Sequence, residues 1–300
     1  MKVAYRNTNT PESSMTTRLR VGVSAMLAAL AVSQTLPATA AAQSDHQVGS
    51  SWNLLSSSTI FEPPIANVRS PEFSASTAMG DGFRRITGVF GARLPLVTYY
   101  RGSATTIQVA LDGGVWSQIT RTGFARFPLR STDYLIGLPL MFQVGLHTIE
   151  FCVAHISAHL GDGDRSGRSA EIFSREFVTA RYGHPLPIGG PGSRSYVSAS
   201  YLVHTIPSEI GRKSGGVGAE LWERGSIYGA RWYVAADAAY SEDTRNLDVS
   251  GQVGFALGTE PNDKASVRLA VSGFSGRDRR GQFLGEPVKQ VSAGVHIRYH

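Results

Sequence analysis

The sequence predicts an all-β protein, a transmembrane antiparallel up-and-down β-barrel of about twelve strands that follows an extended N-terminal arm. Runs of about 11–16 residues alternate between apolar and polar side chains, glycine is abundant (33 residues) and charged residues make up only 17% of the chain. A strand with a period of two presents one face to lipid and the other to the lumen. A glycine-rich, weakly charged composition suits many such strands joined by turns.

Strand length separates this fold from a soluble β-sandwich, whose strands alternate in the same way. Sandwich strands usually have about five or six residues, whereas a tilted strand that crosses a bilayer needs about 9–11. The clearest runs are 290–299 and 227–241, and in the second run Tyr228 and Tyr240 are expected at the two interfacial ends of the apolar face. The longer runs favour the barrel, with a soluble periplasmic β-protein as a further alternative.

The first 42 residues have the pattern of a cleaved signal peptide. Basic residues up to Arg20 precede an apolar stretch at 21–32, and small residues follow as far as Ala42. The apolar stretch is too short for a membrane anchor, which needs about 20 residues. We therefore expect cleavage after Ala42, export, and an outer-membrane location.

The composition limits the kinds of partner that the protein is expected to bind. Residues 1–42 hold four Lys/Arg and one acidic residue, so their removal lowers the formal net charge from +6 to +3. No basic run with interleaved aromatic residues remains, which excludes nucleic acid. Cys152 is the only cysteine and forms no internal disulfide. The expected partners are outer-membrane lipids, and the sequence identifies no protein partner.

After the signal, the chain divides into a Ser/Pro-rich extended periplasmic arm at 43–82 and a barrel at 83–300. Eleven strands are expected in the barrel, at 84–101, 105–119, 132–144, 146–159, 171–182, 194–206, 214–224, 227–241, 245–259, 264–275 and 290–299. Bacterial single-chain barrels have an even number of strands. Parity therefore predicts twelve, from a division of 84–101 near Gly91 or from a strand in the arm, or ten if two of the runs merge.

If the last strand ends on the periplasmic side, the connections after alternate strands face the outside. The outside loops are then 120–131, 160–170, 207–213, 241–245 and 277–289. Most of them are longer than the turns at the other end, as expected of outer-membrane barrels. The exception is the Gly/Pro-rich connection 183–193 on the periplasmic side.

Four segments carry a family resemblance. They are FEPPIANVRSPEF at 61–73, DYLIGLPL at 133–140, HISAHLGD at 155–162 and GQF at 281–283. In this order they resemble a bacterial family of outer-membrane barrels known as domain of unknown function 1207. Asn67-Val68 stands where that family usually has Asp-Pro, and Ala158 where it usually has Ser, which indicates a divergent member. The resemblance implies fold and location, and it supplies no activity.

The segment 149–159 carries the residues best suited to chemistry. Residues two apart in a strand share a face. His155, Ser157 and His159 therefore share the lipid-facing side with Ile149, Phe151 and Val153, whereas Glu150 faces the lumen. Glu176 is expected in the lumen as well, in a charged network with Glu150, Arg231, Asp237 and Arg298.

A serine becomes a nucleophile when a neighbouring base takes its proton, and histidine is the usual base. The His155-x-Ser157 pair resembles the pair that outer membrane phospholipase A and the lipid A deacylases set on a barrel wall, although the Asn-Gly that follows Ser in the phospholipase is missing here. In those families an Asn or Glu on the next strand orients the histidine, a role that Glu171 would fill here. Asp162 and Asp164 in the following loop would suit a calcium ion.

The leading interpretation is a non-enzymatic or uncharacterised outer-membrane barrel, with a role in surface or envelope structure or in small-solute passage and without a cofactor. The alternative is a lipid acyl hydrolase that uses His155, Ser157 and Glu171, with calcium as its one candidate cofactor.

Overall fold

A computed structural model describes residues 50–80, 83–102, 105–120, 127–164, 167–208, 210–258 and 265–299. They belong to one compact unit, residues 47–300. The expected signal segment, its cleavage after Ala42 and the first residues of the arm lie outside the described residues. In the part of the chain that is described, no helix is long and apolar enough to cross a membrane.

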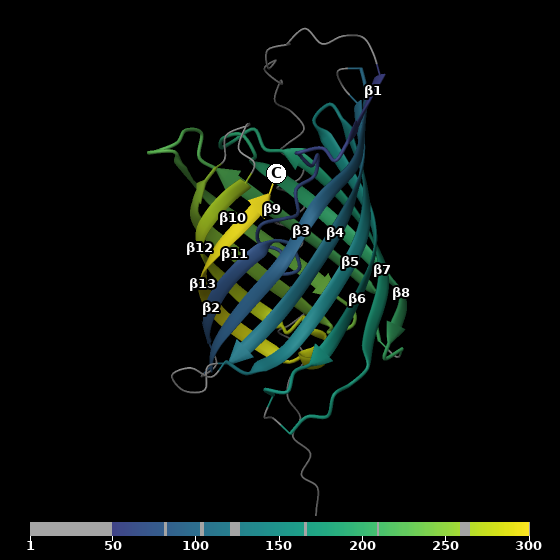
Figure 1. Cartoon of the computed structure of the whole chain (residues 1–300), viewed down its shortest axis with the longest axis vertical. Helices are drawn as coiled ribbons and strands as arrows, with labels where there is room; N and C mark the ends of the chain where they lie inside the picture. Colours follow the sequence, from purple (N-terminus) through teal and green to yellow (C-terminus); the bar gives the residue numbers. More distant parts are fainter. Residues whose placement is uncertain are drawn as a thin grey trace, which may run out of the picture. The chain divides into compact units, whose positions relative to one another are not determined.

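Twelve strands of the described chain form a closed antiparallel ring (Figure 1). They are β2 (Phe73–Gly80), β3 (Phe83–Arg101), β4 (Thr105–Thr120), β5 (Leu129–Val144), β6 (His147–Leu160), β7 (Phe173–Pro185), β8 (Arg194–Ile206), β9 (Lys213–Trp222), β10 (Ala230–Ser241), β11 (Asn246–Leu257), β12 (Ala265–Arg277) and β13 (Pro287–Tyr299). The ring closes where β2 pairs with β13, with Ala75 opposite Val295. The prediction of an up-and-down barrel of about twelve strands is confirmed.

The twelfth strand comes from the arm. The expected division of 84–101 does not occur, because β3 is a single strand of 19 residues whose register shift falls between Pro95 and Val97. Strand β2 has the sequence FSASTAMG. Phe73, Ala75, Thr77 and Met79 alternate with Ser74, Ser76, Ala78 and Gly80, but this pattern covers only eight residues at the end of the Ser/Pro-rich segment. The barrel therefore begins at Phe73, and not at residue 83.

The two faces of the wall differ as alternation predicts. On β6, Phe151 and Val153 point outward and are 47% and 61% exposed, whereas the alternate residues Glu150 and Cys152 are buried on the lumenal side. The same division holds on β10, where Trp232 and Val234 are exposed and Tyr233 is buried. The outward face is thus a band of exposed apolar side chains.

One expected interfacial residue lies outside its strand. Strand β10 begins at Ala230, and Tyr228 precedes it in a turn, fully exposed and with a φ of 54°. The expectation that Tyr228 ends the apolar face of this strand is wrong. The turn signal is Gly229, whose φ of 77° ends any extended conformation before β10. Tyr240 does lie on the outward face.

The arm enters the lumen. A short strand, β1 (Ser50–Leu54), pairs with residues 97–101 of β3, along the edge that β2 leaves free. Between β1 and β2, residues 55–72 turn inward, and we call them the plug. Phe61 packs against Ala110, Met141 and Tyr196 from the lumenal faces of β4, β5 and β8. Ile65 and Ala66 pack against Tyr233, Ala235, Ala256 and Ala270 on β10 to β12.

Buried charges hold the plug in place. Arg93 donates through Nε and Nη2 to Asp112, both at 2.7 Å, and its Nη1 donates to Glu150 at 2.5 Å and to the plug carbonyl of Phe61 at 2.6 Å. On the other side of the lumen, the amide of Ile65 donates to Glu220 at 2.8 Å. Buried charges are tolerated when they are paired and hydrogen-bonded in this way.

The connections fall into two groups. One rim carries the end of β13, and we call the opposite rim the far rim. The far rim carries the β4–β5, β6–β7, β8–β9, β10–β11 and β12–β13 connections, the same five that are expected to face the outside. The β12–β13 connection folds inward over the lumen, where Gln282 and Phe283 are buried.

Candidate functional site

His155 and Ser157 lie on the outward face of β6, close to the far rim. The alternate residues Ile156 and Ala158 are buried on the lumenal side, which fixes the direction of the two polar side chains. Strand β6 ends at Leu160, three residues beyond Ser157. The pair therefore stands where the apolar outward band gives way to the rim.

Glu176 on β7 lies directly across from His155 in the sheet. The Nδ1 atom of His155 is 2.8 Å from Oε1 of Glu176. An ionised carboxylate only accepts hydrogen bonds, so Nδ1 carries the proton and Nε2 is left unprotonated in the neutral ring. An imidazole in this tautomer can accept a proton at Nε2.

A second histidine holds the other carboxylate oxygen. Nδ1 of His204 on β8 is 2.5 Å from Oε2 of Glu176. The pairing of β7 with β8 shifts at this point, because Glu176 lies opposite His204 and Phe177 opposite Leu202. Val203 is therefore the extra residue of a β-bulge, which turns His204 outward although the preceding outward residues have odd numbers. Bulges are common next to functional sites because they redirect a side chain.

These side chains lie near one another on the outside of the wall, and three of them contact Glu176. Ser174 lies opposite Ser157, and its hydroxyl donates to Glu176 Oε1 at 3.4 Å. We call the set the outer-face cluster: His155, Ser157, Ser174, Glu176 and His204. The side chains of His155, Glu176 and His204 are 42%, 38% and 61% exposed. A molecule that approaches the outside of the barrel can therefore reach them.

The acid that contacts His155 is thus Glu176, whereas the sequence indicates Glu171 for this role. Glu171 is exposed in the segment before β7, where its amide donates to Gln282 Oε1 at 3.2 Å and its carbonyl accepts from Gln282 Nε2 at 2.7 Å. The expectation that Glu176 faces the lumen is wrong. Val178, Ala180 and Tyr182 share its parity, and the apolar character of that face is the signal that places Glu176 outside.

The two loop carboxylates differ in their surroundings. Asp164 is buried and accepts from Arg130 Nε at 3.2 Å and Nη2 at 3.1 Å. Asp162 is exposed beside it. In the described ranges, no group of three or more His, Cys, Asp or Glu side chains is placed to hold a metal ion.

Contacts from the lumen fix the far end of β6 behind the cluster. Asp133 Oδ2 accepts from Arg69 of the plug at 2.7 Å and from the amide of Gly281 at 3.0 Å. Gln282 Nε2 donates to the carbonyl of Ala158 at 3.0 Å. A Cβ at position 281 would lie 2.4 Å from Cβ of Ala158, so glycine is required there. The four separate segments of the family resemblance thus meet at one place.

The family model described as "Protein of unknown function (DUF1207)" matches residues 28–300. The chain belongs to this family. No curated protein matches this DUF1207 member.

Solved structures of similar fold include a phospholipase, an autotransporter unit and a porin. The outer membrane phospholipase A from Escherichia coli, in an active-site mutant form, has 14% identity and a TM-score of 0.46 over 81% of this chain and 93% of its own. The transport unit of the Escherichia coli autotransporter AIDA-I has 12% identity and a TM-score of 0.44 over 78% and 92%. An anion-selective porin from Comamonas acidovorans has 9% identity and a TM-score of 0.35 over 76% and 97%. Identities and TM-scores this low carry no information on substrate or activity, which must be argued from the residues of the site.

Proposed function

We propose that this DUF1207 member is an outer-membrane lipid acyl hydrolase with Ser157 as nucleophile, His155 as general base and Glu176 as the residue that positions the base. The observation that carries the proposal is the 2.8 Å contact between His155 Nδ1 and Glu176, made beside a serine two residues along the same face. A nucleophile, a base and a group that orients the base are the three parts that activate a serine.

The surroundings of the cluster support a lipid substrate. Exposed apolar side chains flank it on the same outward face, among them Val153 on β6, Val178 on β7 and Tyr201 on β8. A closed antiparallel barrel with an even number of strands and an apolar outer band is the architecture of outer-membrane proteins. If the far rim faces the outside, an ester near the glycerol backbone or the glucosamine of an outer-leaflet lipid lies at the level of Ser157.

The proposed reaction has two halves. Ser157 Oγ attacks the ester carbonyl carbon while Nε2 of His155 takes the hydroxyl proton, and Glu176 stabilises the imidazolium that forms. The ester C–O bond then breaks, and the leaving alcohol takes the proton from His155. Water hydrolyses the acyl-serine by the same base, which releases the fatty acid and restores Ser157.

Fatty-acid release from defined lipids tests the proposal. The mature barrel, refolded in detergent micelles, is mixed with phosphatidylethanolamine or with lipid A, each with calcium and with a chelator. We expect release from one of the two lipids and its loss in Ser157→Ala. The calcium arm also tests whether the Asp162 and Asp164 loop supports the reaction.

Ser117→Ala is the matched control. Ser117 on β4 alternates with buried Trp116 and Gln118, so it faces outward, and it lies toward the same rim. It belongs to no part of the cluster, and its variant keeps full activity. A fluorophosphonate probe should label wild type and Ser117→Ala and leave Ser157→Ala unlabelled. No release from either lipid, together with no labelling, would overturn the proposal.

A surface or small-solute role is the second candidate, and a polar chamber inside the barrel favours it. The plug and the β12–β13 connection leave a lumenal cavity of about 250 Å³. Conductance of single barrels in a planar bilayer tests passage. A variant without plug residues 57–70 should conduct more than wild type if solutes pass through the lumen, and equal conductance would contradict passage.

A further inference from the structure

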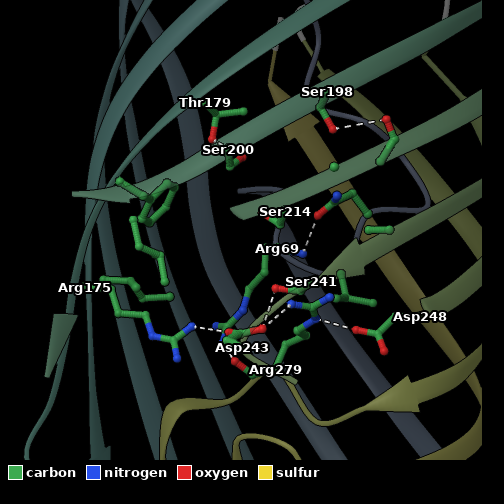
Figure 2. A pocket seen from close by; sticks show the side chains of 18 of the residues that line it. Arg69, Arg175, Thr179, Ser198, Ser200, Ser214, Ser241, Asp243, Asp248 and Arg279 are labelled. Atoms are coloured by element: carbon green, nitrogen blue, oxygen red, sulfur yellow. Dashed lines mark hydrogen bonds and ion pairs between the residues drawn. The ribbon is translucent and has the colours of Figure 1, made fainter. Parts of the chain in front are cut away.

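The lumenal chamber near the far rim has an excess of positive charge. Its described lining contains five arginines and three aspartates, so the formal balance is two positive charges. The arginines come from the plug, β7, the β8–β9 connection and the β12–β13 connection: Arg69, Arg175, Arg181, Arg212 and Arg279. Figure 2 shows Arg69, Arg175 and Arg279 converging with Asp243 in this chamber.

Arg175 is the central observation. It lies on β7, is only 8% exposed, and donates through Nη1 to Asp243 at 2.6 Å. Its Nε and Nη2 atoms have no hydrogen-bond partner among the described residues. Phe173 covers one face of the guanidinium plane, with the ring centre 4.7 Å from Cζ. A buried guanidinium with two unpaired nitrogen atoms is costly unless another molecule satisfies their N–H groups.

The two unpaired atoms form one edge of the guanidinium. Elsewhere in this barrel the same edge binds a carboxylate through two bonds: Arg93 binds Asp112 with Nε and Nη2, and Arg194 binds Glu220 likewise. This fork matches the two oxygens of a carboxylate or a phosphate. In Arg175 the described chain supplies no such partner for it.

The chamber that Arg175 lines also offers space and hydroxyl groups. Thr179, Ser198, Ser200 and Ser214 line the chamber (Figure 2). A volume of about 250 Å³ is smaller than the roughly 300–1,000 Å³ of pockets for drug-sized ligands. Arg69 adds Nη1, which also has no partner in the described chain. We propose that the chamber binds a small free oxyanion of the phosphate class, held by the Nε and Nη2 atoms of Arg175 and by Arg69.

Arg298 provides a matched comparison. Its Nε and Nη2 also lack a partner in the described residues, and it lies 3.6 Å from Glu62. However, the hollow beside it has only about 10 Å³, which is no more than one water molecule occupies. Of these two buried arginines with an unpaired edge, only Arg175 lines a cavity larger than one water molecule.

Calorimetric titration of the full mature barrel in detergent with inorganic phosphate, at constant ionic strength set by chloride, tests the site. Wild type should bind phosphate saturably. Arg175→Gln should weaken the affinity about tenfold to a hundredfold, the value of one or two charge-assisted hydrogen bonds, and Arg298→Gln should leave it unchanged. Absence of saturable binding, or an equal loss in both variants, would overturn the proposal.

Asp243→Asn gives a result that damage to the fold would not produce. It removes a negative charge next to the Nε–Nη2 edge of Arg175 without touching the atoms of that edge, so phosphate should bind more tightly than to wild type. Weaker or unchanged binding in this variant would contradict the site. Each variant is checked for barrel closure by its mobility on a gel before and after heating. Because Ser157 lies on the other face of the wall, Ser157→Ala should bind phosphate like wild type, which separates this site from the proposed hydrolase.

Discussion

Glu150 and Glu176 are two carboxylates that face opposite sides of the same wall, and each accepts hydrogen bonds from two basic side chains. Glu150 lies in the lumen, 1% exposed, between Arg93 and Arg181. Glu176 lies on the outward face, 38% exposed, between His155 and His204. Arginine keeps its charge at every physiological pH, whereas histidine gains and loses a proton near neutrality. The lumenal group is therefore suited to permanent charge pairing, and the outward group to proton transfer.

The largest effect is expected from a change at Glu176 that lowers the activity but not the stability. Glu176→Gln keeps the size of the side chain but no longer stabilises a charged His155, so the rate of lipid hydrolysis should fall about 10²–10⁴-fold. The urea midpoint of unfolding should stay at the wild-type value, because Glu176 is partly exposed. Initial rates of fatty-acid release and tryptophan fluorescence in urea measure the two quantities. A large loss of stability with unchanged activity would show that Glu176 has the structural role assigned here to Glu150.

The lumenal carboxylate should give the opposite result. Glu150→Gln leaves Arg93 and Arg181 without this charged partner in a buried site, which costs about 3–5 kcal/mol of unfolding free energy. The rate per folded barrel should remain that of wild type. Urea unfolding in detergent, followed by the rate measured on the folded fraction, checks both. A stability within about 1 kcal/mol of wild type, the range of an exposed pair, would show that Glu150 does not hold the plug.

Acidic pH should destabilise the lumenal side of the barrel by protonating Glu72 of the plug. Burial raises the pKa of this carboxyl, but the hydrogen bond from His296 and the charge of Arg268 outweigh it and hold the pKa below its ordinary value. A pKa lowered by folding contributes stability that is full above the unfolded value of about 4.3 and is lost as the pH falls through the folded pKa. The urea midpoint of wild type should therefore fall below about pH 4. Glu72→Gln should show a smaller fall over the same range, and an equal fall would contradict this role.

The smallest effect concerns His204. Exposed ion pairs contribute about 0–1 kcal/mol, so His204→Asn should lower the hydrolysis rate less than about fivefold and leave the urea midpoint unchanged. The comparison with Glu176→Gln decides whether His204 only steadies the carboxylate. A loss as large as that of Glu176→Gln would instead make His204 an essential member of the cluster.

The alternation of apolar and polar residues predicted the features that depend on one strand alone: where the strand lies and which face each side chain takes. It placed Glu150 in the lumen and His155 with Ser157 outside, because β6 is regular from end to end. It could not place His204, since the bulge at Val203 reverses parity inside β8. It also could not pair Glu176 with His155, because that contact depends on the register between two strands, with the two residues 21 positions apart in sequence.

The plug shows the same limit on a larger scale. Its proline- and serine-rich sequence indicates an extended segment, and only the partners across the lumen explain why Phe61 and Ile65 are apolar. The nearest of those partners in sequence is Ala110, which lies 49 residues after Phe61. Local sequence therefore predicts that the segment is irregular but not that it is buried.

The position of the plug between β1 and β2 has a consequence for how firmly it is held. The strands at both of its ends pair with β3, and β2 also forms the seam with β13. Both ends of the plug are thus tied to the wall next to the seam, so the plug cannot leave the lumen unless β1 or β2 separates from β3.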